Sequence, residues 1–479
     1  VPGGLRRNGE RAVAWNFDNY GYGRGEMSLY QSHPWVLAVR ADGTAFGVIA
    51  DTPERVLIDL RTDIRFEAPG APWPVIVIDG PTPQAVVTML GQLTGTMPLP
   101  PKWAMGYHQC RYSYTPANRV RDIVYGFRDR NIPCDVIWYD IDYMDHYKCF
   151  TVDTKAFPDM RGLNEEVHGL GFHTVAIIDP GIKIEQGYHV YESGEAIDAW
   201  VKTARGDDYM GRVWPGECVF PDFTMDRVRE WWGGLYGQFL SLGIDGIWND
   251  MNEPAVFNVN TKTMPLSNVH RADDELGGEG THARYHNVYG MLMARASWDG
   301  VKRARPNQRP FVLSRANHLG GQRWAACWTG DNVANWAHVK DSVSMVLNLG
   351  LSGQPLSGPD IGGFAGAGDG PMFARWMGIG SLLPFARGHT GKGNIDKEPW
   401  AFGFEVEETS RLALQARYRL MPYLYTVFRE AWTTGLPVWR PLFFADPADP
   451  RLREVDDCWL IGADLLVCAQ TQPGIDATE

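Results

Sequence analysis

The chain has no long apolar run: nothing in its 479 residues approaches the about 18 consecutive apolar residues of a membrane-spanning helix. Positive charge is scarce too, since the formal net charge is −12 and the isoelectric point is about 5.5. An acidic chain binds poorly to nucleic acid or to an anionic membrane surface, so we expect neither partner. The first residues, Val-Pro-Gly-Gly-Leu-Arg-Arg, lack the apolar core of a signal peptide and an initiator methionine, which predicts a processed, trimmed or partial chain.

Cysteine is also sparse. The seven cysteines are scattered, odd in number and without Cys-x-x-Cys spacing, which predicts neither a disulfide framework nor a structural zinc site. The sequence contains no Asn-x-Ser/Thr site for N-glycosylation. Both features favour an intracellular protein, in the cytoplasm or a plastid.

Several catalytic signatures are missing. Without Gly-x-Ser-x-Gly, a serine nucleophile on a strand-to-helix elbow is disfavoured. Without His-x-His or His-Glu-x-x-His, metal catalysis through His108, His338 or His389 is the weaker reading, and a structural calcium ion stays an alternative. No Gly-x-Gly-x-x-Gly follows the first expected parallel strand, which argues against an open dinucleotide-binding sheet. We therefore expect no cofactor and no catalytic metal.

Hydrophobic patterning divides the chain into three regions. Residues 1–96 alternate in short runs separated by turns, as in a partial antiparallel β-sandwich. After the linker Met97-Pro-Leu-Pro-Pro, residues 97–434 alternate strands and helix-compatible segments, which predicts an α/β fold, a (β/α)8 TIM barrel with inserted loops at 182–222 and 255–290. Residues 435–479 return to β-like runs, as at the start of a C-terminal β domain. The expected barrel strands cover residues 103–109, 135–140, 173–179, 244–250, 311–315, 325–331, 355–360 and 382–387.

Most of these strands end in a charged residue, and all carboxyl ends of a parallel barrel open at one mouth, where catalytic residues lie. Asp250 and Asp331 are two such residues. Converging carboxylates can cleave a glycosidic bond, one as nucleophile and one as proton donor. The 19 tryptophans point the same way, because many stand beside polar strand ends and indoles stack on the C–H faces of sugars. The other charged strand ends are Asp140, Asp142, Asp179, Arg315, Asp360, Arg387 and His389.

Four motifs on these strands resemble glycoside hydrolase family 31, the α-glucosidase superfamily. They are Trp138-Tyr-Asp-Ile-Asp-Tyr-Met, Trp248-Asn-Asp-Met-Asn-Glu, Trp328-Thr-Gly-Asp-Asn and Pro384-Phe-Ala-Arg-Gly-His, in the family's order. The resemblance covers nearly the whole chain. Longer runs such as Gly106-Tyr-His-Gln-Cys-Arg and Leu356-Ser-Gly-Pro-Asp-Ile-Gly-Gly-Phe look most like the plant and algal heteroglycan glucosidase branch.

The resemblance implies a role for each matching residue. Asp250 matches the nucleophile, and Asp331 matches the general acid/base, whose pKa must then be raised by burial or by the Asp250 charge. Asp140 and His389 match the pair that holds hydroxyls of the terminal sugar. Further matches are a supporting network of Arg315, Asp360 and Arg387, apolar walls from Trp214, Trp248, Met251, Trp328 and Phe364, a wall position at Ile177 that admits a C6 hydroxymethyl group, and Asp18 on an N-terminal loop over the pocket.

Other acidic residues are interpreted as structural. Glu253, between Asn252 and Pro254, is interpreted as part of a helix start, and Asp222 as the end of a loop. Asp142 and Asp179 are left out of the catalytic set because capping a loop would explain them equally well. Tyr112 stands where the family commonly has tryptophan, so that wall of the pocket departs from the pattern.

The function implied is a retaining, exo-acting α-glucosidase that removes terminal α-D-glucose from oligosaccharides or a soluble glucan, its expected binding partner, by double displacement. An α-xylosidase, which would narrow the pocket near Ile177, and an α-glucan transglycosylase are alternatives in the same superfamily. A catalytically silent glucan-binding protein is the alternative from another class, although it would not need to retain both Asp250 and Asp331. The sequence does not indicate an oligomeric state or a linkage preference.

Overall fold

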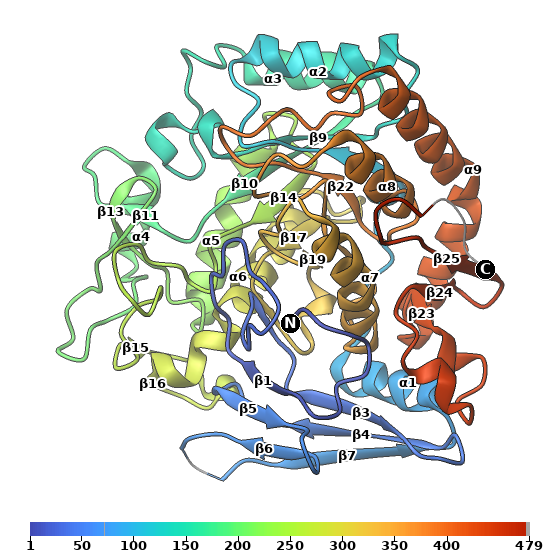
Figure 1. Cartoon of the computed structure of the whole chain (residues 1–479). Coiled ribbons are helices and arrows are strands. Elements are labelled where there is room, and N and C mark those ends of the chain that lie inside the picture. The colour runs from blue at the N-terminus through green and yellow to red at the C-terminus, as the bar shows by residue number, and fades with distance from the viewer. Residues whose placement is uncertain (71, 476–479) are drawn as a thin grey trace.

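The N-terminal region forms two three-stranded antiparallel sheets in the computed structural model, which describes residues 1–70 and 72–475 (Figure 1). One sheet has the order β1 (Arg11–Ala14), β5 (Val56–Asp59), β6 (Arg65–Glu67), and the other β3 (Trp35–Val39), β4 (Ala45–Ala50), β7 (Val75–Gly80). Val36 and Ala50 of the second sheet pack against Val56 and Ile58 of the first. Two sheets that share an apolar layer form the expected partial sandwich.

A helix, α1 (Pro83–Thr94), covers the other face of the second sheet, in a region where the sequence pattern predicts only strands. The Thr82 side chain accepts a hydrogen bond from the Ala85 amide, and Pro83 occupies the first turn, where its missing N–H costs nothing. Val86 and Leu90 then lie on one face and pack against Ile49 of the sheet. The helix seals the sandwich on the side that faces away from its inner layer.

The central region is a parallel barrel. Its strand order is β20-β19-β17-β14-β10-β9-β8-β22-β21. The two end strands, β20 and β21, are separated by one residue in the chain, so the sheet closes on itself with eight strand positions. This confirms the predicted (β/α)8 barrel. The strands are β8 (Tyr107–Gln109), β9 (Val136–Tyr139), β10 (His173–Ile178), β14 (Gly246–Asn249), β17 (Val312–Ser314), β19 (Ala326–Trp328), β20 (Ser357–Gly358), β21 (Asp360–Ile361) and β22 (Ala386–Gly388).

Helices surround the barrel, with one gap (Figure 1). They are α2 (Ala117–Asp129), α3 (Met160–Gly169), α5 (Asp226–Leu240), α6 (His282–Ala304), α7 (Trp336–Leu351), α8 (Gly370–Gly380) and α9 (Phe404–Thr434). The expectation of a helix after every strand is wrong for β17, because residues 315–325 contain only β18 (Asn317–His318) and the 3-10 turn η5 (Gly321–Arg323). There β18 pairs in parallel with β2 (Gln31–Ser32), so the N-terminal region is joined directly to the barrel.

Both expected insertions carry structure of their own. The first contains β11 (Ile182–Lys183), α4 (His189–Ala196), β12 (Gly211–Val213) and β13 (Gly216–Val219). The second contains β15 (Val269–His270), η4 (Asp274–Leu276) and β16 (Gly280–Thr281), and residues 282–290 already belong to α6. Short 3-10 turns also flank the first two barrel strands: η1 (Lys102–Met105), where the sequence predicted strand, η2 (Ile141–Tyr143) and η3 (Asp145–Tyr147).

The described C-terminal residues form a small antiparallel sheet of β23 (Trp439–Pro441), β24 (Cys458–Ile461) and β25 (Leu465–Cys468), with η6 (Leu442–Phe444) and η7 (Pro450–Arg453) between the first two strands. Cys458 and Cys468 are directly opposite in the ladder and form a disulfide. The expectation that the cysteines stay unpaired is therefore wrong for this pair, while the other five are free and buried. Among residues 1–70 and 72–475, no helix has the length and apolar character to cross a membrane.

Candidate active site

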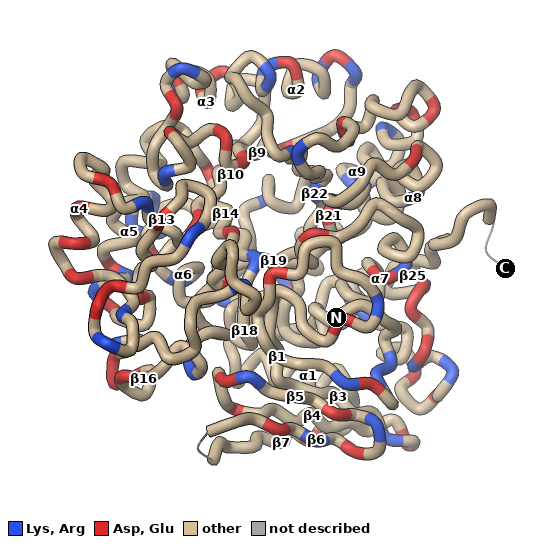
Figure 2. Tube along the Cα trace, turned by 60° about the vertical axis from the view of Figure 1, so that its left-hand side comes forward, with Lys and Arg blue, Asp and Glu red and all other residues tan. Residues whose placement is uncertain are grey.

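Asp250 and Asp331 stand at the carboxyl ends of β14 and β19. All four residues of β14 are buried, as in a strand covered on both faces, and the chain then turns sharply at Met251, which has a φ of 56°. Beyond β19 the turn uses Gly330 at a φ of 79°, where an added Cβ would lie 2.0 Å from the Tyr30 ring. Figure 2 shows acidic segments beside β14, β19 and β21. The two carboxylates are thus placed at one mouth of the barrel, as the sequence predicted.

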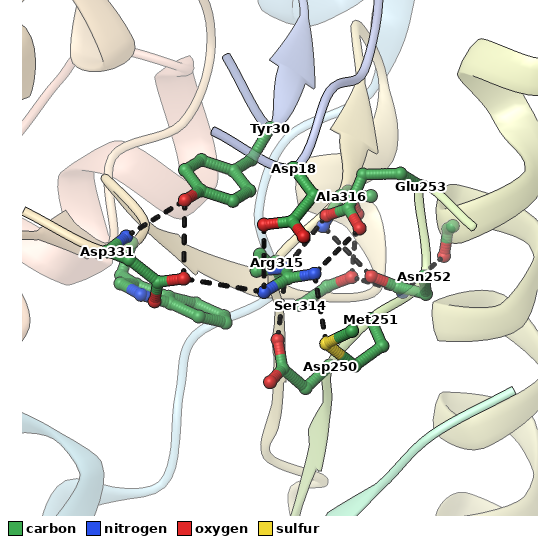
Figure 3. Close-up of polar contacts among 12 residues, drawn as sticks. Asp18, Tyr30, Asp250, Met251, Asn252, Glu253, Ser314, Arg315, Ala316 and Asp331 are labelled. Carbon is green, nitrogen blue, oxygen red and sulfur yellow. Dashed lines mark hydrogen bonds and ion pairs between the residues drawn. The ribbon is translucent and has the colours of Figure 1, made fainter. Parts of the chain in front are cut away.

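A single guanidinium connects the acidic groups (Figure 3). Arg315, at the end of β17, has its Nε 3.1 Å from Asp250 Oδ1 and its Nη1 3.6 Å from Asp331 Oδ2. The same Nη1 lies 3.8 Å from Asp18 Oδ1, which comes from the N-terminal loop. Glu253 receives hydrogen bonds from Nε and Nη2, both at 2.8 Å, in a bidentate pair. Arg315 therefore fixes the relative positions of both candidate catalytic groups.

Burial and this guanidinium set the protonation of the pair. Burial raises the pKa of Asp250, while the Arg315 charge opposes that rise. Burial raises the pKa of Asp331 well above its ordinary value, with Arg315 again opposing and the Asp250 charge adding to the rise. The Asp250 carboxylate lies closer to Arg315, so the geometry favours an ionised Asp250 beside a protonated Asp331. Burial also raises the pKa of Glu253 to about 7 against the lowering by Arg315.

A second buried ion pair joins the neighbouring strands β21 and β22. Arg387 Nη2 donates a hydrogen bond to Asp360 Oδ1 at 2.7 Å, and both side chains are fully buried. Strands β21 and β22 place these two residues side by side in register. The Arg387 guanidinium also faces the rings of Trp138, Trp248 and Trp328, at 4.9, 4.9 and 5.0 Å from their centroids. A cation held against these three indoles fixes the positions of the rings relative to one another.

Asp140 and His389 lie together at the ends of β9 and β22. His389 Nε2 is 3.8 Å from Asp140 Oδ2, and its ring lies 4.8 Å from that of Phe364 and 5.5 Å from that of Trp248. Burial raises the pKa of Asp140 and lowers that of His389. Cys110 brings a third possible metal ligand within 4.8 Å of these two. Burial raises the pKa of the Cys110 thiol well above its ordinary value, and a protonated thiol beside the Arg387 charge does not fit a cation site.

The remaining predicted walls lie at different depths. Ile177 in β10 and Met251 are buried, and Met251 Sδ accepts a hydrogen bond from Arg315 Nη2 at 3.2 Å. Trp214 lies on the turn between β12 and β13 and is 38% exposed, with its ring 6.1 Å from Tyr112 and 4.9 Å from Phe257. Tyr112 thus supplies an aromatic surface beside Trp214 in spite of its departure from tryptophan. Trp214 is therefore an exposed member of the predicted wall residues, unlike the buried Ile177 and Met251.

Comparison with known proteins decides the family. The model described as "Glycosyl hydrolases family 31 TIM-barrel domain" matches residues 97–427, and the family's N-terminal galactose mutarotase-like domain matches residues 2–59. The chain belongs to glycoside hydrolase family 31.

Relatives and solved structures agree with this family 31 assignment. The chain is 44% identical over 475 residues to alpha-glucosidase 2 of Bacillus thermoamyloliquefaciens, covering 98% of the chain and 60% of the relative. It is 38% identical over 458 residues to a probable glucan 1,3-alpha-glucosidase of Oryza sativa subsp. japonica, covering 92% of the chain and 49% of the relative. The crystal structure of a family 31 alpha-glucosidase from Bacteroides thetaiotaomicron matches with a TM-score of 0.90 and 48% identity, covering 100% of the chain and 79% of that structure. The chain thus spans 60% and 49% of the lengths of these two curated relatives.

Tyr30 and Lys397 of this family 31 site were not singled out from the sequence, and Glu253 was interpreted as structural. Glu253 begins no helix; residues 251–254 form turns that aim its carboxylate at Arg315. Tyr30, from the N-terminal region, donates a hydrogen bond from its hydroxyl to Asp331 Oδ2 at 3.3 Å. Lys397 donates to the Gly363 and Gly366 carbonyl oxygens at 2.6 and 2.7 Å, on either side of Phe364. Of these three residues, only Glu253 had a signal in the sequence, because its carboxylate follows Asp250 by three residues.

Proposed function

We propose that the protein is a retaining, exo-acting α-glucosidase. The observation that carries the proposal is the attachment of Asp250 and Asp331 to one guanidinium, that of Arg315, at the mouth of a family 31 barrel. Alpha-glucosidase is also the printed name of the relative that is 44% identical over nearly the whole chain.

In the proposed mechanism Asp250 attacks the anomeric carbon of the terminal glucose while Asp331 gives its proton to the leaving oxygen. The bond from the anomeric carbon to that oxygen breaks as the bond to Asp250 forms. Asp331, now ionised, takes a proton from water, which attacks the glycosyl ester and releases Asp250. Two inversions at the anomeric carbon give α-glucose. Arg315 stays between the two carboxylates throughout and stabilises whichever of them is ionised.

The other predicted residues serve as binding groups in this proposal. Asp18, Asp140 and His389 hold hydroxyls of the terminal sugar through charged or polar hydrogen bonds. The indoles of Trp248 and Trp328 form the apolar floor that Arg387 fixes from below. Met251, Phe364, Trp214 and Ile177 complete the walls, with Ile177 as the position that leaves room for the C6 hydroxymethyl group.

The test is time-resolved proton NMR of maltotriose with the protein. Early α-glucose supports the proposal, and early β-glucose overturns the retaining assignment. Asp250→Ala should lower kcat by several orders of magnitude, while the protein should still fold and bind maltose. Asp245 offers a matched control, because it precedes the same strand at the opposite end of the barrel, where its carboxylate pairs with His168 at 2.8 Å. Asp245→Asn should lower the melting temperature and retain turnover.

The same assay, run with maltotriose and then with an α-xyloside, separates the alternatives. Longer glucans among the early products would identify a transglycosylase, and cleavage of α-xylosides in preference to α-glucosides would identify an α-xylosidase. Binding of maltotriose without any turnover would identify a glucan-binding protein. An intracellular compartment stays a hypothesis that rests on the five unpaired cysteines, because the Cys458–Cys468 disulfide removes part of its support.

A further inference from the structure

Three buried histidines form a continuous hydrogen-bonded chain beside the active site. His270 of β15 has its Nδ1 2.9 Å from Asp222 Oδ1 and its Nε2 2.9 Å from His282 Nδ1. His282 Nε2 in turn lies 2.9 Å from His286 Nδ1, one turn further along α6. The last nitrogen, His286 Nε2, lies 2.6 Å from the carbonyl oxygen of Asn16. All three imidazoles are fully buried. The chain therefore runs from an insertion of the barrel to the N-terminal loop.

A count of the protons shows that the three histidines of this hydrogen-bonded chain cannot all be neutral. Both ends, the Asp222 carboxylate and the Asn16 carbonyl, are acceptors, so His270 Nδ1 and His286 Nε2 must each carry a proton. Each of the two internal N···N contacts needs one proton as well, because two lone pairs at 2.9 Å would repel. Four contacts need four protons, and three neutral imidazoles supply three. The Thr263 hydroxyl lies 3.3 Å from His282 Nε2 and could donate a hydrogen bond to it. This does not change the count, because His282 Nε2 and His286 Nδ1 would still face each other at 2.9 Å without a proton between them.

The extra proton fits best on His270. Burial holds the pKa of His282 well below its ordinary value and lowers that of His286 to about 3, so both stay neutral. Burial disfavours the charged form of Asp222, yet its pKa is lowered because the His270 charge and several hydrogen bonds outweigh burial. An imidazolium at His270 donates to Asp222 and to His282, and each following ring donates onward to Asn16. Every nitrogen of the chain then has a partner of the right kind.

The other charged and titratable groups around the three histidines interact with residues outside the histidine chain. Arg271 pairs with Asp198, and Arg284 lies over the Tyr285 ring at 5.3 Å. Lys262 Nζ donates to the Asp18 carbonyl at 2.7 Å. The Tyr285 and Tyr289 rings contact His270 at 5.8 and 6.2 Å, and the Tyr289 hydroxyl donates to Pro221 O. Among the described residues, Asp222 is thus the group whose charge bears directly on the histidines.

His286, at the far end of the histidine chain, holds the loop that carries Asp18. The Asn16 amide and side chain both bond Asn287 of α6, at 2.9 and 3.0 Å, and Trp15 stacks on His286 at 3.7 Å. Two residues later Asp18 reaches Arg315 at the mouth of the barrel. Loss of the extra proton would leave three protons for four contacts. If His270 keeps its hydrogen bond to Asp222, His282 and His286 must then carry their protons on Nδ1 instead of Nε2. The Nε2 lone pair of His286 faces the Asn16 oxygen at 2.6 Å, and this repulsion pushes the loop outward.

We propose that the His270–His282–His286 chain is a positioning device for Asp18, which retains one proton beyond those of three neutral imidazoles and uses it to hold Asn16 in place. The consequence for catalysis rests on the function proposed above, whereas the retained proton does not. Protonation at His270 is thereby linked to binding of the terminal sugar and not to the chemical step. Asp18 lies 3.8 Å from Arg315, whereas Glu253 holds that guanidinium with two hydrogen bonds of 2.8 Å, so a shift of Asp18 leaves Arg315 in place.

The first test is ¹⁵N–¹H NMR of the protein labelled at histidine, at pH 7. One imidazolium at His270 and two neutral rings protonated at Nε2, His282 and His286, are expected. Three neutral rings would overturn the proposal. Asp222→Asn removes the paired anion, so the imidazolium signal should disappear while the protein stays folded. Persistence of that signal in Asp222→Asn would also contradict the assignment. This test does not depend on whether the protein hydrolyses glucosides.

The second test is kinetic. His286→Phe keeps a ring against Trp15 and removes the donor to Asn16, which leaves a buried carbonyl unpaired, so KM for maltose should rise about tenfold with kcat within about twofold. His286→Gln, whose amide can still donate to Asn16, should recover part of the loss. Tyr285→Phe is the matched control on the same helix and should leave KM unchanged. A fall in kcat with an unchanged KM would overturn the positioning role, and absence of turnover in the unmodified protein would overturn the proposed function alone.

Discussion

Glu253 offers the sharpest test of how the site holds its two carboxylates. Its carboxylate is 1% exposed and receives two hydrogen bonds from Arg315, both at 2.8 Å. Glu253→Gln preserves the shape of the side chain. The amide keeps one acceptor oxygen but turns an NH2 group toward the second guanidinium nitrogen, and the charge is lost. Arg315 then has fewer restraints, and its charge beside Asp250 and Asp331 is compensated by one carboxylate fewer.

The magnitude follows from the bonds lost. A hydrogen bond to a charged group contributes about 1.5–3 kcal/mol, and breaking a buried pair costs about 3–5 kcal/mol in all. We expect a loss of about 3 kcal/mol, divided between folding stability and positioning of Arg315. If all of it reached the transition state, kcat/KM would fall about 100-fold, since 1.4 kcal/mol corresponds to tenfold. The freed charge lies 3.6 Å from Asp331 Oδ2 and favours its ionised form, so the pKa of Asp331 should fall.

The assay is the pH profile of kcat/KM for maltose hydrolysis, together with thermal unfolding. In Glu253→Gln the basic limb, where Asp331 loses its proton, should move to lower pH. Glu398→Gln is the matched control: Glu398 is equally buried and accepts a hydrogen bond from Tyr114 at 2.6 Å. It should lower stability and leave the basic limb in place. An unshifted limb in Glu253→Gln, with kcat/KM within about twofold, would refute the view that Glu253 restrains Arg315.

Three further outcomes are expected. Tyr30→Phe removes the hydroxyl that donates to Asp331 and should lower kcat severalfold with little change in KM, measured by initial rates. Because burial raises the pKa of both carboxyls, the profile of kcat/KM should be bell-shaped with both limbs above the ordinary carboxyl range, falling at low pH as Asp250 gains a proton and at high pH as Asp331 loses one. Reduction of the Cys458–Cys468 disulfide, which spans 10 residues, should lower the free energy of unfolding by about 3 kcal/mol without loss of turnover, and a loss of turnover at unchanged stability would contradict it.

The parts of the fold that the sequence predicted are those with strong local patterns. Buried parallel strands are continuous apolar runs, so β10 and β14 were found within a few residues of their bounds. Two segments were misjudged because local signals were weak or tertiary contacts decided. Helix α1 begins with Thr82 and Pro83 inside a region of strands, and the stretch after β17 pairs with β2 of the N-terminal region instead of forming a helix.

The residues of the candidate site likewise divide into those that sequence patterns predict and those that only the structure reveals. Asp250 and Asp331 could be located because a parallel barrel brings strand ends to one mouth, whatever their distance along the chain. Glu253 was read as part of a helix start because its partner, Arg315, is 62 residues away. Tyr30 is 301 residues from Asp331, and no local pattern connects them. Arg315, Asp360 and Arg387 also support other side chains, but they were found because they lie in or near family motifs. Tyr30 and Glu253 become visible as supporting residues only when the fold brings them to their partners.

The concentration of buried acids has a cost in stability that follows from the same contacts. Burial raises the pKa of Asp140, Asp179, Asp331 and Asp360, so the folded protein binds protons more tightly than the unfolded chain. Stability must then fall as pH rises from the ordinary carboxyl range through these raised values, since the folded state gives up the protons it favours. Asp331→Asn removes the cost of keeping this buried carboxyl protonated at a pH where the unfolded chain ionises it. The substitution also keeps a polar group near Tyr30, so the inactive variant should melt at a higher temperature than the parent at neutral pH. The gain should vanish at a pH low enough to protonate Asp331 in both states. A variant that melts lower at neutral pH would show that Arg315 stabilises the ionised Asp331 by more than its burial costs.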